Sequence, residues 1–302
     1  MVKKILFGLL KKFKFLPQKT FIKIYYEYYS GKKLDLDNPV EFYEKISWYK
    51  VFFRPKILNQ LVDKYAVKSY VEDKIGKQYL NETLAVYERS SEVDFDKLPD
   101  QFVIKGVHGY HFNLIVKDKK KLNKIKSRYL FKKWMSKNQY FRGGKEWAYK
   151  DVKPRLIAEK YLEEMGKEVL NDYKFFCFNG VPKFVQIDLD RGTTNSRCYY
   201  DMEWKKLDLF TKNTPFYEGE IDKPENFGEM KKVAQKLAAK LPFTRVDLYS
   251  IQGKTLFGEM TFYPSDARNS FLPEKYNKII GDYFVLPAIP KGQKYITSLV
   301  TD

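Results

Sequence analysis

The sequence is poor in the residues that build disulfide and metal scaffolds. It has only two cysteines, Cys177 and Cys198, and two histidines, His108 and His111. Two cysteines exclude a disulfide framework and a cysteine-rich zinc module, and two histidines argue against a histidine-built metal site. Long apolar runs are missing as well, since no stretch approaches the roughly 18 apolar residues of a transmembrane helix. These absences favour a protein of the reducing cytoplasm.

Positive charge, in contrast, is abundant. Of 302 residues, 56 are Lys or Arg and 38 are Asp or Glu, which gives a net charge of +18. Residues 1–33 and 117–133 form two clusters of net +8, each with nine basic residues against one acidic residue. Such clusters attract nucleic acid, anionic lipid or an acidic polysaccharide, although the 117–133 cluster can also be a solvated charged face. No zinc finger, RNA-recognition signature or helix-turn-helix accompanies them, so no specific nucleic acid is expected.

The N-terminus has the pattern of a basic amphipathic helix. Residues 1–17 read MVKKILFGLLKKFKFLP, in which apolar residues recur at helical spacing between lysines. The apolar core is short and no small-residue cleavage site follows it, so we expect no signal peptide. Two interpretations stay open: a helix that lies in a membrane interface, and a first helix that docks on the core.

The rest of the chain alternates helical and strand patterns. A composition of 44% hydrophobic and 31% charged residues fits a globular protein of one or two domains. After an aromatic-rich helical segment, the periodicity predicts further helices over 63–75, 122–135 and 226–240. Short apolar runs around turn residues predict a strand over 155–158 and hairpins over 101–116, 173–189 and 245–260. Hairpins with intervening helices predict an α+β enzyme with antiparallel sheets.

The last hairpin carries the strongest chemical signal. Asp247 lies on its first strand, Glu259 on its second, and Thr261 shares a strand face with Glu259. Carboxylates that converge from adjacent strands can hold Mg²⁺, which prefers hard oxygen ligands and bridges phosphates. The alternative is a pair of solvated surface carboxylates.

Two other segments have features of a nucleotide site. Lys105 ends an apolar strand and precedes a turn with Gly106 and Gly109, where a lysine and backbone N–H groups can reach a phosphate. The Walker A spacing is absent, and an exposed strand-end lysine is the alternative. Residues 155–164 pass from an apolar strand into an acidic, aromatic linker. This linker can offer backbone groups to an adenine and a carboxylate to a ribose, or it is a charged loop.

In this order, the segments resemble the TupA-like ATP-grasp family, named after a teichuronopeptide biosynthesis protein. The resemblance rests on the strings DKYAVKSYV, FDKLPDQFVIKGVHG, KPRLIAEKYLEE, NDYKFFCFNGVPKFVQIDLDR and FTRVDLYSIQGKTLFGEMTF, within residues 60–275. It implies the ATP-grasp fold, in which two α+β subdomains clasp Mg-ATP between antiparallel sheets. The expected parts are a helical N-terminal region, a smaller subdomain with a phosphate loop and a larger one with the metal-binding hairpin: residues 1–58, 59–158 and 159–302.

The resemblance also implies ATP and Mg²⁺ as cofactors, and roles for particular residues. The phosphate contacts would be Lys64, Lys105, His108 and Gly109. The adenine linker would be Glu159, Lys160, Tyr161 and Leu162, and Glu163 or Glu164 would suit the ribose. The metal ligands would be Asp247, Glu259 and Thr261, and the contacts to phosphate or acyl phosphate would be Lys174 and Arg245. Two places depart from the family pattern: Thr261 replaces an Asn, and the bulky Tyr110 and His111 replace small residues.

ATP-grasp enzymes are mostly carboxylate–amine ligases, so the resemblance implies ligation through an acyl phosphate. The expected partners are an amino acid and an acidic glycan of a bacterial surface polysaccharide, joined at a uronic-acid carboxylate. The glycan can be free or a nucleotide- or lipid-linked precursor. A chain of net +18 attracts such a polyanion, and the basic N-terminus would place the enzyme at the anionic inner face of the cell membrane.

Two alternatives to the ligase stay open. A glycosyltransferase would use the triplet Asp188-Leu189-Asp190 to hold a metal and a nucleotide sugar. A degenerate ATP-grasp protein would bind glycan or membrane without catalysis, which the departures at Thr261 and at Tyr110-His111 suggest.

Overall fold

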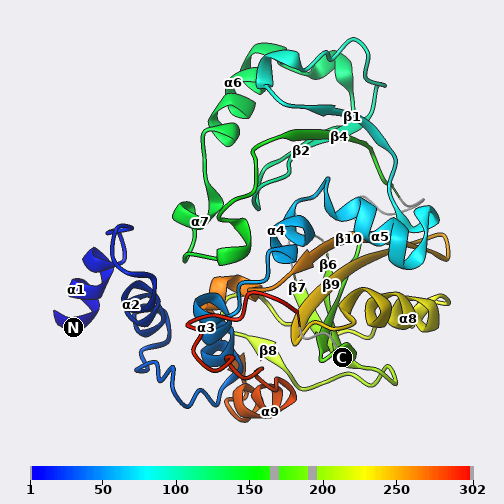
Figure 1. Ribbon diagram of the computed structural model, residues 1–302. Helices are drawn as coiled ribbons and strands as arrows, with labels where there is room; N and C mark the ends of the chain where they lie inside the picture. Colours follow the sequence, from blue (N-terminus) through cyan, green and yellow to red (C-terminus); the bar gives the residue numbers. More distant parts are fainter. Residues whose placement is uncertain (1, 164–169, 190–195, 300–302) are drawn as a thin grey trace.

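Two antiparallel β-sheets with their own helices form two lobes of the molecule (Figure 1). The computed structural model describes residues 2–163, 170–189 and 196–299. Every pair of neighbouring strands in the two large sheets is antiparallel. The predicted α+β class with antiparallel sheets is therefore confirmed.

The smaller lobe is a four-stranded sheet in the order β1-β4-β2-β3, with helix α6 over it (Figure 1). Its strands are β1 (Thr83–Tyr87), β2 (Phe102–Gly106), β3 (Asn113–Val116) and β4 (Leu156–Lys160). Its helices are η2 (Ser90–Glu92), η3 (Lys119–Lys121), α6 (Lys124–Met135), α7 (Gln139–Arg142) and η4 (Trp147–Tyr149). Helix α6 begins where the Asn123 side chain accepts the Lys126 N–H, as an N-cap does. Its Phe131 and Trp134 pack with Phe102 into a small separate core.

The larger lobe is built on a five-stranded sheet in the order β10-β9-β5-β6-β7. Its strands are β5 (Asp172–Phe178), β6 (Val181–Leu189), β7 (Ser196–Asp201), β9 (Phe243–Ile251) and β10 (Lys254–Thr261). The remaining elements are the strand pair β8 (Phe210–Thr211) and β11 (Phe271–Leu272), and the helices α8 (Phe227–Ala238), η5 (Pro264–Ala267) and α9 (Lys275–Tyr283).

Tight turns fix the register of the two hairpins in this sheet. Asn179 and Gly180 join β5 to β6, and Gln252 and Gly253 join β9 to β10. All four residues have positive φ, between 48° and 78°. Two successive residues in this region make the turn whose twist matches that of the strands, and Asn and Gly adopt it at low cost. The predicted hairpins over 173–189 and 245–260 are therefore confirmed.

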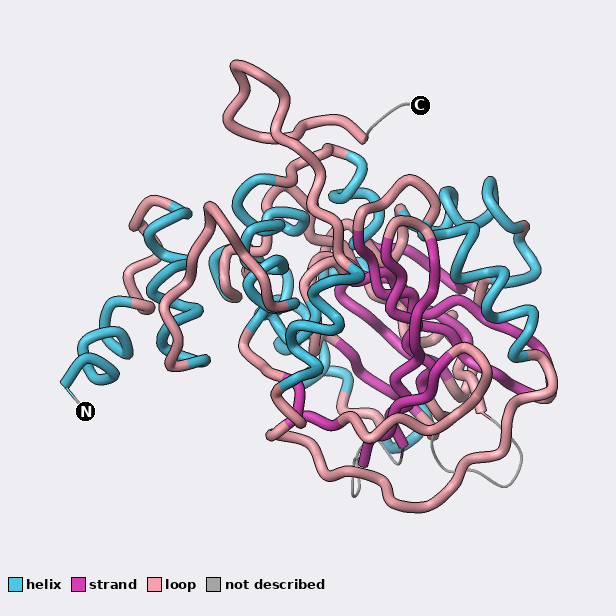
Figure 2. The backbone as a smooth tube through the Cα atoms, turned by 90° about the horizontal axis from the view of Figure 1, so that it is seen from below, coloured by secondary structure: helices cyan, strands magenta, loops and turns pink. Residues whose placement is uncertain are grey.

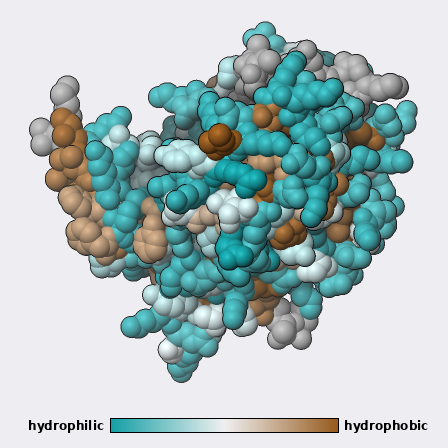
Figure 3. Space-filling model, turned by 90° about the horizontal axis from the view of Figure 1, so that it is seen from above, coloured by the Kyte–Doolittle hydropathy of each residue, from teal (hydrophilic) through white to brown (hydrophobic). Residues whose placement is uncertain are grey.

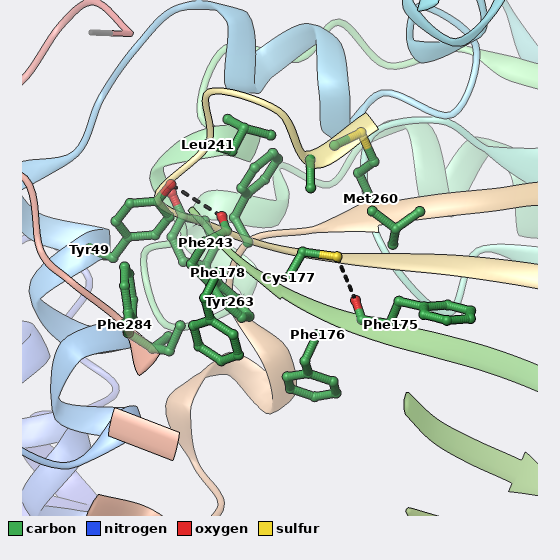
Figure 4. Packing of buried hydrophobic residues seen from close by; sticks show 14 of the residues in the cluster. Tyr49, Phe175, Phe176, Cys177, Phe178, Leu241, Phe243, Met260, Tyr263 and Phe284 are labelled. Atoms are coloured by element: carbon green, nitrogen blue, oxygen red, sulfur yellow. Dashed lines mark hydrogen bonds between the residues drawn. The ribbon is translucent and has the colours of Figure 1, made fainter. Parts of the chain in front are cut away.

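Five N-terminal helices precede the sheets. They are α1 (Val2–Leu10), α2 (Gln18–Ser30), α3 (Phe42–Phe52), α4 (Ile57–Val62) and α5 (Val67–Ile75), and the short η1 (Lys77–Tyr79) follows them. Helix α3 lies in the larger core, where the Tyr49 hydroxyl donates a hydrogen bond to the Phe243 carbonyl (Figure 4). Helix α5 begins later than the predicted residue 63, because the Asp63 side chain accepts the N–H groups of Tyr65 and Ala66 in a turn.

The boundary between the lobes differs from the one that the sequence predicts. Leu61, Val62, Val67 and Val71 of α4 and α5 are buried in the larger core, and the small core begins at β1. The predicted smaller subdomain of residues 59–158 therefore includes helices that pack with the larger lobe. The apolar pattern of a helix does not say which of two cores will bury it.

Helix α1 lies at one end of the molecule, away from the strands (Figure 2). It rests on α2, where Gly8 faces the Tyr28 ring and the Lys11 ammonium lies 3.6 Å from the centre of that ring. Ile5, Leu6 and Leu9 are exposed, so α1 adds nothing to the large core. In the parts of the chain that the structure describes, no helix combines the length and apolarity needed to cross a membrane.

The two faces of the five-stranded sheet differ in character. Phe175, Val185 and Val246 point to the face that α8 covers, where the Phe175 and Phe227 rings stack 5.8 Å apart. Because side chains alternate along a strand, the residues next to them point to the other face. That face carries polar and charged groups, and it forms the floor of the site described next.

Candidate active site

One cavity of about 330 Å³ lies between the two lobes. Its floor comes from the five-stranded sheet, and its other walls come from β2, β4, helix α5 and the loops that follow β2, α7 and β10. A cavity of this size, lined by polar groups that converge from both lobes, is the default position for a substrate site.

A row of residues that lie directly opposite one another on adjacent strands crosses the floor of the cavity. Glu259 pairs with Asp247, Asp247 with Lys174, Lys174 with Gln186, and Gln186 with Tyr199. All five residues line the cavity. Register partners on adjacent strands point to the same face, so the strand pairing itself places the charged groups side by side.

Arg245 holds the two carboxylates of the predicted metal site. Its Nε and Nη2 donate to the two oxygens of Asp247 at 2.7 Å each, and Nη2 lies 3.6 Å from Glu259 Oε1 and 3.2 Å from the Thr261 hydroxyl. Glu259 Oε2 in turn accepts a hydrogen bond from Lys64 Nζ at 3.0 Å. The residues predicted from the last hairpin therefore lie together, with Lys64, from the turn between α4 and α5, beside them.

The two carboxyl groups of this pair differ in acidity. Burial raises the pKa of Asp247 to about 6, although Arg245 and Lys174 oppose the effect. Burial also acts on Glu259, but there the ammonium of Lys64 and the guanidinium of Arg245 dominate and hold the pKa well below its usual range. Glu259 is thus the permanent anion of the pair, while Asp247, which already contacts Arg245, is the weaker acid and takes up a proton more readily as the pH falls.

The donor set fits Mg²⁺ as a partly protein-bound ion. Among the residues that the structure describes, no group of three or more His, Cys, Asp or Glu side chains could hold a metal on its own. Mg²⁺ commonly keeps several waters and binds through one or two carboxylates together with phosphates of a substrate. Asp247 and Glu259 supply those two carboxylates, and the Thr261 hydroxyl is already held by Arg245.

Three lysines converge on the cavity from two elements, and one of them, Lys64, is the lysine that contacts Glu259. Lys64 and Lys68 belong to the start of α5 and the turn before it, and Lys105 belongs to β2. Glu159 lies between two of them, with Oε1 2.6 Å from Lys68 Nζ and Oε2 2.7 Å from Lys105 Nζ. Burial opposes the charge of Glu159, but Lys105 and Lys68 lower its pKa overall. This part of the cavity therefore carries excess positive charge, which suits phosphate groups.

Lys68 is a site residue that the sequence did not identify. It lies four residues after Lys64, which places both on one face of the helical turn. That spacing was the available signal. What no local pattern shows is its ion pair with Glu159, which lies in a different lobe of the molecule.

The predicted adenine linker contributes fewer side chains than expected. Glu159 and Leu162 line the cavity, whereas Lys160, Tyr161 and Glu163 do not. The Lys160 backbone is held by Glu82 and Asn81, since its N–H donates to the Glu82 carbonyl and its carbonyl accepts from Asn81. Glu159 is a counter-charge for lysines and does not act as a free base-binding group. Glu164, the other residue considered for ribose, lies outside the described residues.

The phosphate loop also corrects a prediction. His108 is buried in the small lobe, where Nε2 lies 3.0 Å from the Trp134 carbonyl and burial lowers the pKa of the imidazole. Gly109 packs against Phe112 and Gln139. Neither His108 nor Gly109 lines the cavity, and the side chains that do are Tyr110, His111 and Asn113. The residues that depart from the family pattern are thus the ones in contact with the site.

Lys174 and Asp188 form a buried ion-pair network on the floor. Lys174 Nζ lies 2.5 Å from Asp188 Oδ2 and 3.0 Å from Asp172 Oδ2. Arg197 donates to both oxygens of Asp188, and Gln186 donates to Oδ1. Although burial acts in the opposite direction, these cations hold the pKa of Asp188 well below its usual range. Both oxygens of Asp188 are thus occupied, which leaves the Asp-x-Asp alternative without a free ligand there; Asp190 lies outside the described residues.

Two antiparallel sheets that close over one polar cavity are the arrangement expected of an ATP-grasp fold. The family model for TupA-like ATPgrasp proteins matches residues 44–285, so this chain belongs to the TupA-like ATP-grasp family. The comparison with curated proteins found no match.

Solved structures with similar folds are distant in sequence. D-alanine–D-alanine ligase from Bacillus anthracis, complexed with ATP, is 16% identical over 68% of this chain and 55% of its own, with a TM-score of 0.41. The corresponding enzyme from Helicobacter pylori is 13% identical over 82% of this chain and 69% of its own, with a TM-score of 0.45. Phosphoribosylamine–glycine ligase from Thermotoga maritima is 15% identical over 70% and 50%, with a TM-score of 0.43. This chain spans about half of the first of these proteins.

The buried Asp188 network predicts a large effect of a single substitution. Asp188→Asn should lower the free energy of unfolding at pH 7 by about 3–5 kcal/mol, because it removes the carboxylate whose two oxygens accept from Arg197 and leaves Asp172 as the counter-charge of Lys174. The pKa of Asp188 is depressed, so the carboxylate stabilises the fold above pH ~4 and this contribution is lost as pH falls further. Urea unfolding at pH 7 and at pH 3 checks both statements.

The matched control is Asp208→Asn, which removes an exposed carboxylate of the same lobe. It should change the free energy of unfolding by less than about 0.5 kcal/mol. Equal stability of Asp188→Asn and Asp208→Asn at pH 7 would contradict the network.

Proposed function

We propose that this protein is an ATP-dependent carboxylate–amine ligase that works through an acyl phosphate. The observation that carries the proposal is one cavity lined by Lys64, Lys68 and Lys105 together with the carboxylates Asp247 and Glu259, in which Lys64 contacts Glu259. Cations suit the phosphates of a nucleotide, and a carboxylate pair suits the magnesium ion that accompanies them. Membership of the ATP-grasp family supports the same chemistry.

The side chains of the cavity can position and stabilise both reaction steps. In the first step a substrate carboxylate takes the γ-phosphoryl group of ATP; in the second an amine displaces phosphate from the acyl phosphate. Lys64 and Arg245 touch Glu259 and face the same space, so they can neutralise charge that develops on the transferred group. Magnesium, held by Asp247 and Glu259, would supply further charge neutralisation. Lys174 holds Asp172 and Asp188 and thereby keeps the floor rigid.

We further propose that the carboxylate belongs to a uronic acid of a bacterial surface polysaccharide or its precursor, and that the amine is an amino acid. The family resemblance suggests this substrate class. The net charge of +18 supports it, because a strongly positive protein concentrates a polyanionic glycan around itself.

A degenerate, non-catalytic protein is the second candidate. One observation favours it: Arg245 donates to both oxygens of Asp247, so this carboxylate already has a cation. The ligase requires Asp247 to exchange part of this contact for an ion that arrives with the nucleotide. The glycosyltransferase alternative has no comparable support, since Asp188 is enclosed by Lys174 and Arg197.

The N-terminal helix supports a peripheral position at an anionic membrane. Ile5, Leu6, Leu9, Phe13 and Phe15 are between 45% and 81% exposed and form an apolar arm at the edge of the molecule (Figure 3). Lys4 and Lys12 beside them are exposed as well. An apolar face flanked by lysines is the surface that inserts into the headgroup region of an anionic bilayer. We propose that this arm brings the enzyme to the inner face of the cell membrane, where lipid-linked glycans are assembled.

The ligase proposal predicts a specific loss of activity. Glu259→Gln should lower ATP-dependent phosphate release by on the order of 10²–10³-fold, because it removes the permanent anion of the carboxylate pair. The measurement is phosphate release with glucuronic or galacturonic acid oligomers and a mixture of amino acids. Glu225→Gln, an exposed site in the larger lobe, is the control. An unchanged rate in Glu259→Gln would remove Glu259 from the reaction.

The arm predicts membrane binding that depends on both its apolar and its basic residues. Sedimentation with vesicles of phosphatidylglycerol and phosphatidylcholine should recover the full chain. Leu6→Ser combined with Leu9→Ser should reduce the bound fraction at least tenfold, since each change removes an apolar side chain from the interface. Ile115→Ser, an exposed apolar site on the smaller lobe, should not reduce it. Equal binding of all variants would contradict the proposal.

A further inference from the structure

One carboxyl group of the cavity differs from all the others. Seven Asp or Glu side chains line it, and six of them form ion pairs with Lys or Arg: Glu159, Asp172, Asp188, Asp247, Glu259 and Asp266. The seventh is Glu146, for which the described part of the chain contains no ion pair. A buried carboxylate is costly without a counter-charge, so Glu146 either keeps its proton or is ionised by a cation that a ligand brings.

Glu146 lies in the wall of the cavity. It lies in the turn between α7 and η4, is 3% exposed, and lines the cavity. Its Oε2 is fully buried and has no hydrogen-bond partner in the described structure. Gly143 closes over this oxygen so tightly that a Cβ there would lie 3.0 Å from it and 3.2 Å from the Tyr110 hydroxyl. The turn therefore packs closely around this oxygen, and the Gln139 amide lies beside it, 3.0 Å from the same Cβ position.

The groups around Glu146 come from every side of this pocket. They are Lys50, Tyr110, Gln139, Tyr149, Tyr263, Asp266 and Arg268. Lys50 forms its ion pair with Asp266 instead of Glu146, because its ammonium donates to the side chain and the backbone carbonyl of Asp266. Burial, reinforced by the charge of Asp266, raises the pKa of Glu146 to about 8. Without a ligand, Glu146 is mostly protonated at neutral pH.

The neighbouring carboxylate, Asp266, is already used in hydrogen bonds and an ion pair that hold the structure. It accepts hydrogen bonds from the Tyr25 hydroxyl at 2.7 Å and the Gly144 N–H at 2.9 Å, in addition to Lys50. It sits in a run of three consecutive non-glycine residues with positive φ, Ser265, Asp266 and Ala267. Such strained backbone persists where surrounding contacts hold it, and it is typical of functional sites. Asp266 therefore anchors the strained turn, and Glu146 lies next to it with no ion pair among the described residues.

We propose that Glu146 binds the ammonium group of the amine substrate and accepts its proton, an assignment that rests on the proposed ligase function. Tyr149 connects this place with the reaction centre: burial raises the pKa of its hydroxyl, with Glu146 and Glu259 both adding to the effect. The amine pocket and the carboxylate pair are thus parts of one continuous space.

The proton and electron balance of this step is simple. The Glu146 carboxylate takes one proton from the ammonium and leaves a neutral amine with a free electron pair. The amine nitrogen attacks the carbonyl carbon of the acyl phosphate, the C–N bond forms, and the C–O bond to phosphate breaks. The leaving phosphate takes the second proton of the nitrogen, so the products are an amide, hydrogen phosphate and protonated Glu146. A base with a pKa near the working pH is well suited to this transfer.

The test separates binding of the nucleotide from binding of the amine. Wild type, Glu146→Gln and the exposed control Glu203→Gln are each loaded with Mg²⁺ and a non-hydrolysable ATP analogue, whose binding calorimetry measures. The twenty L-amino acids, D-alanine and D-glutamate are then examined one by one by saturation-transfer NMR. We expect equal nucleotide affinity in all three proteins, and at least one amino acid whose affinity falls tenfold or more only in Glu146→Gln.

A second measurement needs no variant. Binding of that amino acid to wild type at pH 7 should release close to one proton, because Glu146 is protonated when free and ionised beside an ammonium. Calorimetry in buffers of different ionisation enthalpy measures this number. The inference is overturned if nucleotide binds but no amino acid does, if Glu146→Gln binds the amino acid as wild type does, or if no proton is released. Failure of wild type to bind the nucleotide would instead overturn the ligase function on which the inference rests.

Discussion

The site depends on the antiparallel pairing of five strands, which fixes a row of charged side chains on one face of a sheet. Because Glu259, Asp247 and Lys174 are register partners, a slip of one residue would turn them all to the apolar face under α8. The two tight turns at Asn179-Gly180 and Gln252-Gly253 fix the register of their hairpins and so disfavour such a slip. The register is therefore both a folding constraint and the device that assembles the cavity floor.

Charge compensation follows from this arrangement. A face with so many buried ionisable groups is stable only when cations and anions alternate, and the ion pairs of Arg245, Lys174 and Arg197 achieve this. The second lobe adds Lys68 and Lys105, which share Glu159. The lysines that suit phosphates and Glu146, a carboxyl with no ion pair among the described residues, line the same cavity. Under the proposed function, the lysines would bind phosphates and Glu146 an ammonium group.

Local sequence patterns predicted the parts of the fold that local forces determine. The Asn-Gly turn, the periodicity of α8 and the pair Asp247–Glu259 were all visible in the sequence, because turn chemistry and strand alternation act over a few residues. Contacts between distant segments were not visible. Lys68 meets Glu159 across the two lobes, and the packing of α4 and α5 with the larger core depends on tertiary structure. His108 was predicted to contact phosphate because it lies in the glycine-containing turn after β2, but its ring is buried against the Trp134 carbonyl. Glu146 carried no signal, since its distinguishing property is the ion pair it lacks among the described residues.

The most direct test of the account is a comparison of nucleotides by calorimetry. Wild type and Asp247→Asn are titrated with Mg-ATP and with Mg complexes of UDP-glucose and UDP-glucuronic acid. The account predicts that wild type binds Mg-ATP, that it does not bind the nucleotide sugars, and that Asp247→Asn weakens binding of Mg-ATP. Binding of a nucleotide sugar without binding of ATP would contradict it and direct attention back to Asp188.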